Sequence, residues 1–186
     1  MMSIMNNKEN NSKIIASDPN FNIDYILIKH LDDPSIKEII DISIDLKKIY
    51  GPNTFLTENN IHKYFNEKTL PFIAKHNNKI IGFIIGAPLE YFKNQSWTQY
   101  DENMEQENTL YTYAFVFKKA YRNKNAYAKT LKRVYTNWAK KKGFKYITGH
   151  VNKKRASVIN GNLEILKEFP IWYDSKVPFV YYRKKI

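Results

Sequence analysis

The stretch from residue 109 to residue 150 passes through a strand, a basic turn, a helix and a second strand. The four segments are Thr109–Phe117, Lys118–Asn125, Ala126–Lys141 and Lys145–Gly149. The helix is indicated by apolar residues that recur on one face, and from Lys118 to Arg155 the chain carries fourteen Lys or Arg and no Asp or Glu. Because a helix start has free N–H groups and a dipole that favours an anion, the basic turn predicts a phosphate site.

The rest of the chain predicts further helices and strands around this unit. These are a strand at Tyr25–Ile28, a helix from Asp33-Pro34 to Gly51-Pro52, a short helix at Glu58–Asn66, a hairpin of Pro71–His76 and Lys79–Gly86 about Asn77-Asn78, a loop at 93–108, a helix at Ser157–Phe169 and a strand at Pro178–Arg183. The order predicts a single α/β domain over residues 21–186, with a mixed central β-sheet flanked by helices. Residues 1–20 are polar and predict a flexible N-terminal tail.

Composition narrows the class of protein. At 186 residues with 43% apolar and 15% aromatic side chains, the chain suits one folded domain. A net charge of +12 favours an acidic partner, such as nucleic acid, a membrane surface or a phosphorylated small molecule. The lack of cysteine excludes disulfides and thiolate catalysis and fits a reducing cytoplasm. We expect no metal site, because the four histidines are scattered, and no membrane partner, because no apolar run approaches ~20 residues.

The element order and the residues around Arg122 resemble the GCN5-related N-acetyltransferase superfamily, over roughly Tyr25 to Arg183. The signature of that family is Arg or Gln, two residues, Gly, one residue, then Gly or Ala, at the start of the helix after the fourth strand. Arg122 matches its first position, whereas Asn125 and Tyr127 stand where glycine and a small residue are usual. The resemblance implies the acyl-CoA transferase fold of that family.

The resemblance also implies a site for acetyl-CoA. Main-chain N–H groups of the basic turn would hold the pyrophosphate, and the preceding strand would pair with the pantetheine amides as an added strand does. That strand is typically splayed from the next one. Asn152, just past the last strand of the unit, is either a further cofactor contact or a turn or cap residue. The residues concerned are Ala114, Phe115, Val116, Phe117, Arg122, Asn123, Lys124, Asn125, Ala126, Tyr127, Ala128 and Asn152.

Direct acetyl transfer needs a neutral amine and a proton donor for the leaving thiolate. The family places that donor, a tyrosine, in the helix after the fifth strand, but Ser157–Phe169 contains none. His150 is a candidate base, although an ordinary hydrogen-bonded histidine is the alternative interpretation. In the loop 93–108, Glu107 is a candidate for binding the amine or taking its proton, with a solvated loop as the alternative. The catalytic candidates are Tyr173, Tyr111, His150 and Glu107.

The sequence thus predicts an acetyl-CoA-dependent N-acetyltransferase that acts on a primary amine of a small molecule or protein. The acids of the loop 93–108 suit a cationic acceptor: Asp101, Glu102, Glu105 and Glu107. Two alternatives are a basic nucleic-acid-binding module and a non-catalytic acyl-CoA-binding relative. The nucleic-acid alternative would use aromatics interleaved with cations, as in the run from Tyr181 to Lys185. A homodimer is left open, and the cytoplasm is the expected location.

Overall fold

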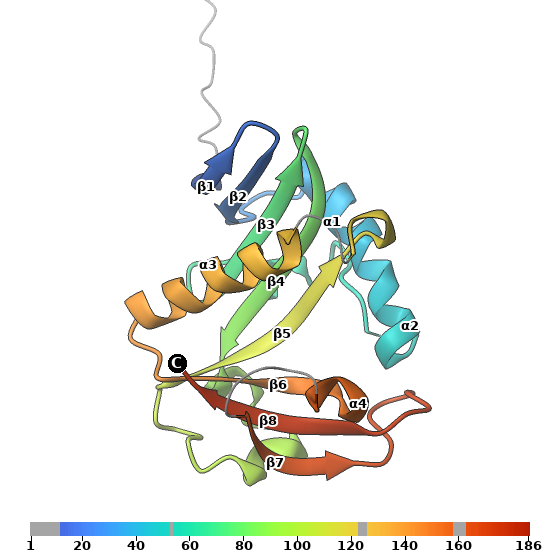
Figure 1. Ribbon diagram of the computed structural model, residues 1–186, viewed down its shortest axis with the longest axis vertical. Coiled ribbons are helices and arrows are strands. Elements are labelled where there is room, and N and C mark those ends of the chain that lie inside the picture. The colour runs from blue at the N-terminus through green and yellow to red at the C-terminus, as the bar shows by residue number, and fades with distance from the viewer. Residues whose placement is uncertain (1–11, 53, 123–125, 158–162) are drawn as a thin grey trace, which may run out of the picture.

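One twisted sheet of eight strands runs through the molecule in the order β1-β2-β3-β4-β5-β6-β8-β7 (Figure 1). The computed structural model describes residues 12–52, 54–122, 126–157 and 163–186. Neighbouring strands pair antiparallel, except for β5 and β6, which are parallel. The strands are β1 (Ser12–Asp18), β2 (Phe21–Ile26), β3 (Leu70–His76), β4 (Lys79–Pro88), β5 (Thr109–Phe117), β6 (Tyr146–Asn152), β7 (Leu163–Phe169) and β8 (Phe179–Lys185).

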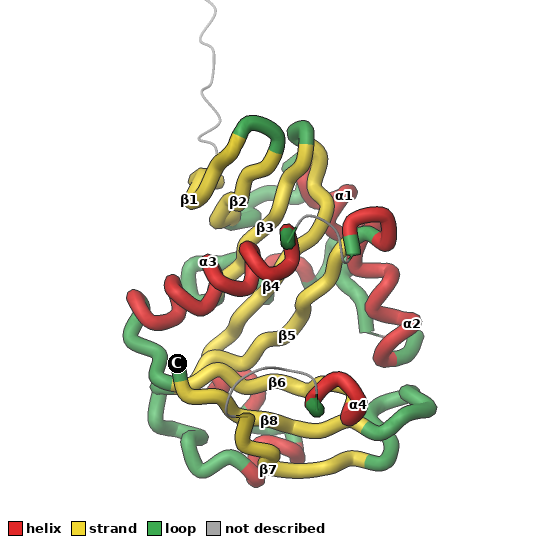
Figure 2. Tube along the Cα trace, in the orientation of Figure 1, coloured by secondary structure: helices red, strands yellow, loops and turns green. Residues whose placement is uncertain are grey.

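Helices cover both faces of the sheet, as Figure 2 shows by colour. On one face lie α1 (Ser35–Ser43) and α2 (Lys47–Tyr50), which a 3-10 turn at Ile44–Leu46 joins; on the other lies α3 (Tyr127–Lys141). The short α4 (Lys153–Ala156) follows β6. The Asp33 carboxylate accepts the Ser35 backbone N–H at 2.9 Å, just before the N-cap residue Pro34 of α1. Gly51, at φ 108°, ends α2 in a conformation that favours glycine.

Each face has its own hydrophobic core. In the core under α1, isoleucines from every turn of the helix pack on side chains of β4 and β5. The helix residues are Ile36, Ile39 and Ile42, and the strand residues are Phe83, Ile85, Ala114 and Val116. The core under α3 is built from side chains four residues apart on the helix: Leu131, Tyr135 and Ala139, all at most 1% exposed. Gly86 lets α3 approach, because a Cβ there would lie 2.5 Å from the Tyr135 hydroxyl. These cores fix β4 and β5 between two helical layers.

Several sequence predictions are confirmed. Asn77 and Asn78 turn the β3–β4 hairpin at φ 48° and 63°, the left-handed values that a two-residue turn requires. The predicted strand Thr109–Phe117 is β5 with the same bounds, and the predicted helix Ala126–Lys141 is α3, which begins one residue later. The strand and the helix on either side of the basic turn therefore exist as predicted, whereas residues 123–125 of the turn lie outside the described residues.

Three predictions of local structure are wrong. Leu163–Phe169 was expected within a helix but forms β7, because it pairs antiparallel with β8, a contact that no local pattern reveals. Residues 12–20, assigned to the flexible tail, form β1 and the turn that pairs it with β2. Of the predicted tail, residues 1–11 lie outside the described residues. The helix expected at Glu58–Asn66 is a 3-10 turn at Ile61–Lys63, which still buries Ile61 and Phe65.

Candidate active site

The strands β5 and β6 pair over only three residues and then separate. The pairs are Thr109 with Tyr146, Leu110 with Ile147 and Tyr111 with Thr148. Beyond Tyr111, β5 continues to Phe117 along β4, whereas β6 continues to Asn152 along β8 (Figure 1). A bulge opposite Ile85 and Gly86, which leaves Tyr113 as the extra residue, accompanies the separation. The β5 edge from Thr112 to Phe117 is therefore unpaired among the described strands, in agreement with the predicted splay.

Ala114, Phe115, Val116 and Phe117 form this edge and alternate in their environment. Ala114 and Val116 are buried under α1, and Phe117 is buried under α3. Phe115 keeps 38% of its surface exposed. This edge therefore offers a ligand mainly its main-chain N–H and C=O groups. A ligand that pairs as an added strand would bind to these groups.

Arg122 braces the basic turn. Its Nε donates to the Phe117 carbonyl at 2.8 Å, and its Nη2 donates to the Asp45 carboxylate at 2.7 Å. A hydrogen bond from Lys48, together with the charge of Arg122, lowers the pKa of Asp45. The guanidinium thus ties the end of β5 to the segment between α1 and α2.

The start of α3 carries the remaining motif residues. Ala126 precedes the helix at φ 56°, a left-handed conformation. Tyr127, which stands where a small residue is usual, packs its ring on Phe21 of β2 at a centroid distance of 4.6 Å. Ala128 is half-buried in the same core. Asn123, Lys124 and Asn125, also assigned to cofactor binding, lie outside the described residues.

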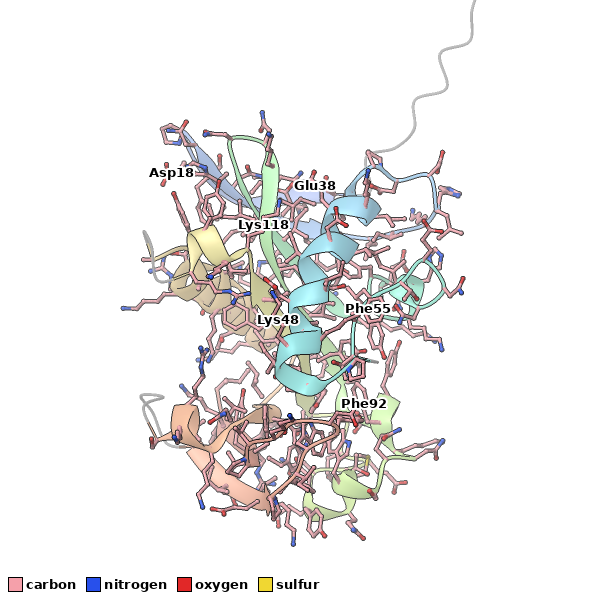
Figure 3. All side chains as sticks on the ribbon, turned by 90° about the vertical axis from the view of Figure 1, so that its right-hand side faces the viewer. Asp18, Glu38, Lys48, Phe55, Phe92 and Lys118 are labelled. Atoms are coloured by element: carbon pink, nitrogen blue, oxygen red, sulfur yellow. The ribbon has the colours of Figure 1, made fainter. Side chains whose placement is uncertain are left out.

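A cavity of about 330 Å³ opens where β5 and β6 separate, on the face that carries α1 and α2. It takes residues from both strands and from the loops around them. The described lining residues are Leu46, Tyr50, Thr54, Phe55, Leu56, Tyr64, Tyr91, Phe92, Gln95, Trp97, Tyr111, Thr112, Tyr113, His150, Trp172 and Tyr173. Figure 3 looks onto this face, with Phe55 and Phe92 near the lower end of the α1–α2 segment.

Two of the predicted catalytic residues are in direct contact at this cavity. The Tyr111 hydroxyl lies 2.9 Å from His150 Nδ1. The imidazole stacks on Trp172 at a centroid distance of 3.5 Å and is 8% exposed. Burial lowers the pKa of His150 to about 2, and burial raises the pKa of Tyr111 well above its usual value. A histidine that stays neutral throughout the physiological range is a poor base, which favours the ordinary hydrogen-bonded interpretation.

The other candidates differ in their access to the cavity. Tyr173 lines it and remains 59% exposed. Glu107 is not among the lining residues, and its backbone N–H donates to the Glu90 carboxylate at 2.9 Å. Asn152 caps α4, where its side-chain oxygen accepts the Lys154 N–H at 2.9 Å, as the alternative interpretation held.

Sequence reasoning missed the aromatic wall of the cavity. Trp97 lies on a 3-10 turn at Ser96–Tyr100, in the loop that was interpreted as polar, and Trp172 follows β7. Tyr64 stacks on Tyr113 at a centroid distance of 3.8 Å. These residues come from segments far apart along the chain, so no short motif joins them. The one available signal was the aromatic content of 15% itself.

Two of the four acids of the loop 93–108, Asp101 and Glu102, contact Arg183 on β8. Asp101 is buried, where it accepts hydrogen bonds from the Tyr181 hydroxyl at 2.7 Å and from Arg183 at 3.2 Å. Glu102 accepts a hydrogen bond from Arg183 at 2.8 Å. Burial by itself lowers the pKa of Arg183, but the hydrogen bonds that Arg183 donates to Glu164 and Glu102 raise this pKa overall. None of these acids lines the cavity, so the basis for a cationic acceptor is weaker than the sequence suggested.

Comparison with known proteins places the chain in a family. Residues 37–160 match the model of the Acetyltransferase (GNAT) family. Since the match spans most of the chain, the protein belongs to this family and is an acetyltransferase. A search of curated proteins finds no match.

Solved structures share the fold. The GCN5-related N-acetyltransferase from Kribbella flavida is 11% identical with a TM-score of 0.64, over 91% of this chain and 100% of that one. The ribosomal-protein-S18-alanine N-acetyltransferase from Escherichia coli is 12% identical with a TM-score of 0.59, over 89% and 94%. Ard1 from Thermoplasma volcanium is 11% identical with a TM-score of 0.62, over 90% and 98%. At such identities the likeness concerns the fold.

Within the described part of the chain, no cluster of three or more His, Asp or Glu side chains suits a metal ion. None of the described helices has the length and apolar character needed to cross a membrane.

Proposed function

We propose that this acetyltransferase uses acetyl-CoA as co-substrate and transfers the acetyl group to a primary amine of a small molecule or protein by direct attack. The observation that carries the proposal is the unpaired β5 edge, which runs from the cavity at Tyr111 to the basic turn at Lys118. A pantetheine arm paired with this edge would bring its thioester to the cavity, and its pyrophosphate to the start of α3.

The residues present fit that co-substrate. The edge offers main-chain groups without a strand partner among the described strands, and α3 begins at the end of the basic turn. Arg122 holds the turn against β5 and Asp45 rather than reaching outward. Its role in the proposal is therefore to position the turn. Asn123, Lys124 and Asn125 keep the phosphate-binding role that the family resemblance implies.

Positioning supplies much of the acceleration in a direct attack. For the proton on the leaving thiolate, Tyr173 is the donor that we favour, because it lines the cavity and keeps contact with solvent. Tyr111 is buried and bonded to His150, so the pair supports the cavity wall in this proposal. A small amine fits the cavity as acceptor. The cytoplasmic location and the homodimer remain predictions from the sequence.

The nucleic-acid alternative loses its main support. Tyr181 and Tyr182 are buried, and Arg183 is bonded to Asp101, Glu102 and Glu164. This run therefore presents no exposed aromatic ring interleaved with free cations, as single-stranded RNA would require.

The proposal is tested by binding and turnover together. Acetyl-CoA at tens of micromolar should raise the melting temperature, and moderate salt should leave that rise in place. Release of free thiol with an amine panel should show turnover. Salt-sensitive RNA retention without an acetyl-CoA effect would overturn the proposal, and stabilisation without turnover of any amine would indicate the non-catalytic relative.

Tyr173→Phe should lower kcat by about 100-fold while the stabilisation by acetyl-CoA stays unchanged, because loss of a general acid slows only the chemical step. Tyr100→Phe is the matched control, since Tyr100 is also exposed but does not line the cavity. Equal kcat values for the two variants would exclude Tyr173 as the proton donor.

A further inference from the structure

The cavity at the β5–β6 separation carries no formal charge on its described walls. Its lining comprises aromatic and aliphatic side chains, two threonines, Gln95 and the neutral His150. The nearby acids Asp101 and Glu102 are bonded to Arg183. An acceptor with several ammonium groups would therefore lose hydration in this cavity without meeting a carboxylate, which is costly.

The walls are flat and aromatic on several sides. Tyr64 and Tyr113 stack with rings 13° apart, and Trp97 stacks on Tyr111 at a centroid distance of 4.8 Å. Phe92 lies 4.6 Å from Tyr111 by the same measure. Aromatic faces attract another ring, or a single ammonium, but they cannot neutralise a polycation. A volume of about 330 Å³ is at the small end of ligand pockets and suits one ring with a short chain.

Two buried polar atoms of this wall have no hydrogen-bond partner among the described residues. They are Trp97 Nε1 and His150 Nε2, on side chains 4% and 8% exposed. Neither atom has accessible surface at the empty cavity, so both lie within the packed aromatic cluster behind the wall. The cavity therefore offers a ligand aromatic surface rather than these donors.

We propose that the acceptor of this enzyme is a small amine with one flat apolar ring, bound in the cavity that Trp97, Tyr113 and Trp172 line. This inference rests on the proposed function, since it assigns the cavity to the acceptor, and it specifies the class of amine. The sequence suggested a cationic acceptor bound by the acids of the loop 93–108, and this inference assigns its binding to the aromatic cavity instead.

Tryptophan fluorescence emission can report the binding of an amine in the cavity without any turnover. The chain has three tryptophans, of which Trp97 and Trp172 line the cavity. Trp138 packs on Tyr25 and Phe72 under α3, on the other face. In Trp138→Phe, emission therefore comes from the cavity alone. Phenylalaninamide should change that emission saturably, and spermidine should not. Should this variant fail to fold, the wild type gives the same titration over a constant Trp138 background.

Turnover gives the second measure. With acetyl-CoA and the full chain, kcat/KM for phenylalaninamide should exceed that for spermidine by at least tenfold. An equal or higher kcat/KM for spermidine would overturn the inference about the acceptor. So would a tryptophan emission that phenylalaninamide leaves unchanged. In either case, stabilisation by acetyl-CoA would still support the proposed function.

If acetyl-CoA does not stabilise the protein, the proposed function is wrong. The emission titration would then still show which amine the cavity binds.

Discussion

His150 shows how one buried side chain limits the chemistry at this site. Its ring lies between Trp172 and Tyr181, with Trp97 at its edge and the Tyr111 hydroxyl on Nδ1. None of these neighbours is an anion, so protonation of the ring would bury an unpaired charge. The position at the end of the strand suggested a base, but the surroundings make His150 a neutral hydrogen-bonding group.

The same burial predicts a pH dependence of stability. The pKa of His150 is about 2 in the folded protein against an ordinary value of 6.5. Below that ordinary value the unfolded chain binds a proton that the folded chain does not, so the free energy of unfolding falls as the pH falls from 6.5 toward 2. The slope approaches ~1.4 kcal/mol per pH unit. His150→Phe should remove this contribution, as denaturant unfolding across a pH series would show.

Trp172→Phe is the control for that measurement. It perturbs the same aromatic cluster without removing a titratable group, so it should lower stability by a similar amount at every pH. If His150→Phe keeps the wild-type slope below neutral pH, the histidine is protonated in the folded protein and the assignment of a neutral ring is wrong.

At the level of elements, the basic turn depends on contacts with three other segments. The Lys118 N–H donates to the Ile81 carbonyl at 2.8 Å, which joins the turn to β4. Arg122 joins it to β5 and, through Asp45, to the segment between α1 and α2. The start of α3 is thus placed relative to the β5 edge by hydrogen bonds rather than by glycine.

This bracing predicts a graded series of variants. Arg122→Ala removes both contacts and should raise the dissociation constant for acetyl-CoA about tenfold, as expected for the loss of charge-assisted hydrogen bonds. Asp45→Asn removes only the ion pair, which is partly exposed, and should raise the dissociation constant for acetyl-CoA by about threefold or less. Calorimetry would measure both. If Asp45→Asn keeps the wild-type dissociation constant while Arg122→Ala raises it 100-fold, Arg122 contacts the phosphate directly.

The sequence predicted those elements whose signals are local. Apolar runs bounded by Asn77-Asn78 and by Lys118 gave β4 and β5, and an apolar stripe gave α3. Leu163–Phe169 was misassigned because Leu163, Leu166 and Phe169 are spaced three apart, as on a helix, whereas the segment pairs with β8. In the site, Tyr111 and His150 were named, but their contact with Trp97 and Trp172 depends on how distant segments pack.

Over the whole molecule, the net charge of +12 concentrates on and around α3. Its exposed face carries Lys129 near the start and Lys140 near the end, eleven residues apart, or about 16 Å along the axis. At physiological salt, charges separated by more than ~8 Å are largely screened. If the proposed diphosphate binds at the start of the helix, only cations of the first turn would therefore act on it, and the far lysines would contribute solubility or nonspecific attraction.

A pair of charge reversals separates these roles. Lys129→Glu should raise the dissociation constant for coenzyme A by about threefold to tenfold at physiological salt, whereas Lys140→Glu should change it by less than about twofold, because of the screening length. At low salt the two variants should converge, since the field then reaches across the helix. Equal effects at physiological salt would mean that the charge acts as one diffuse patch, which suits an extended polyanion better than a bound diphosphate.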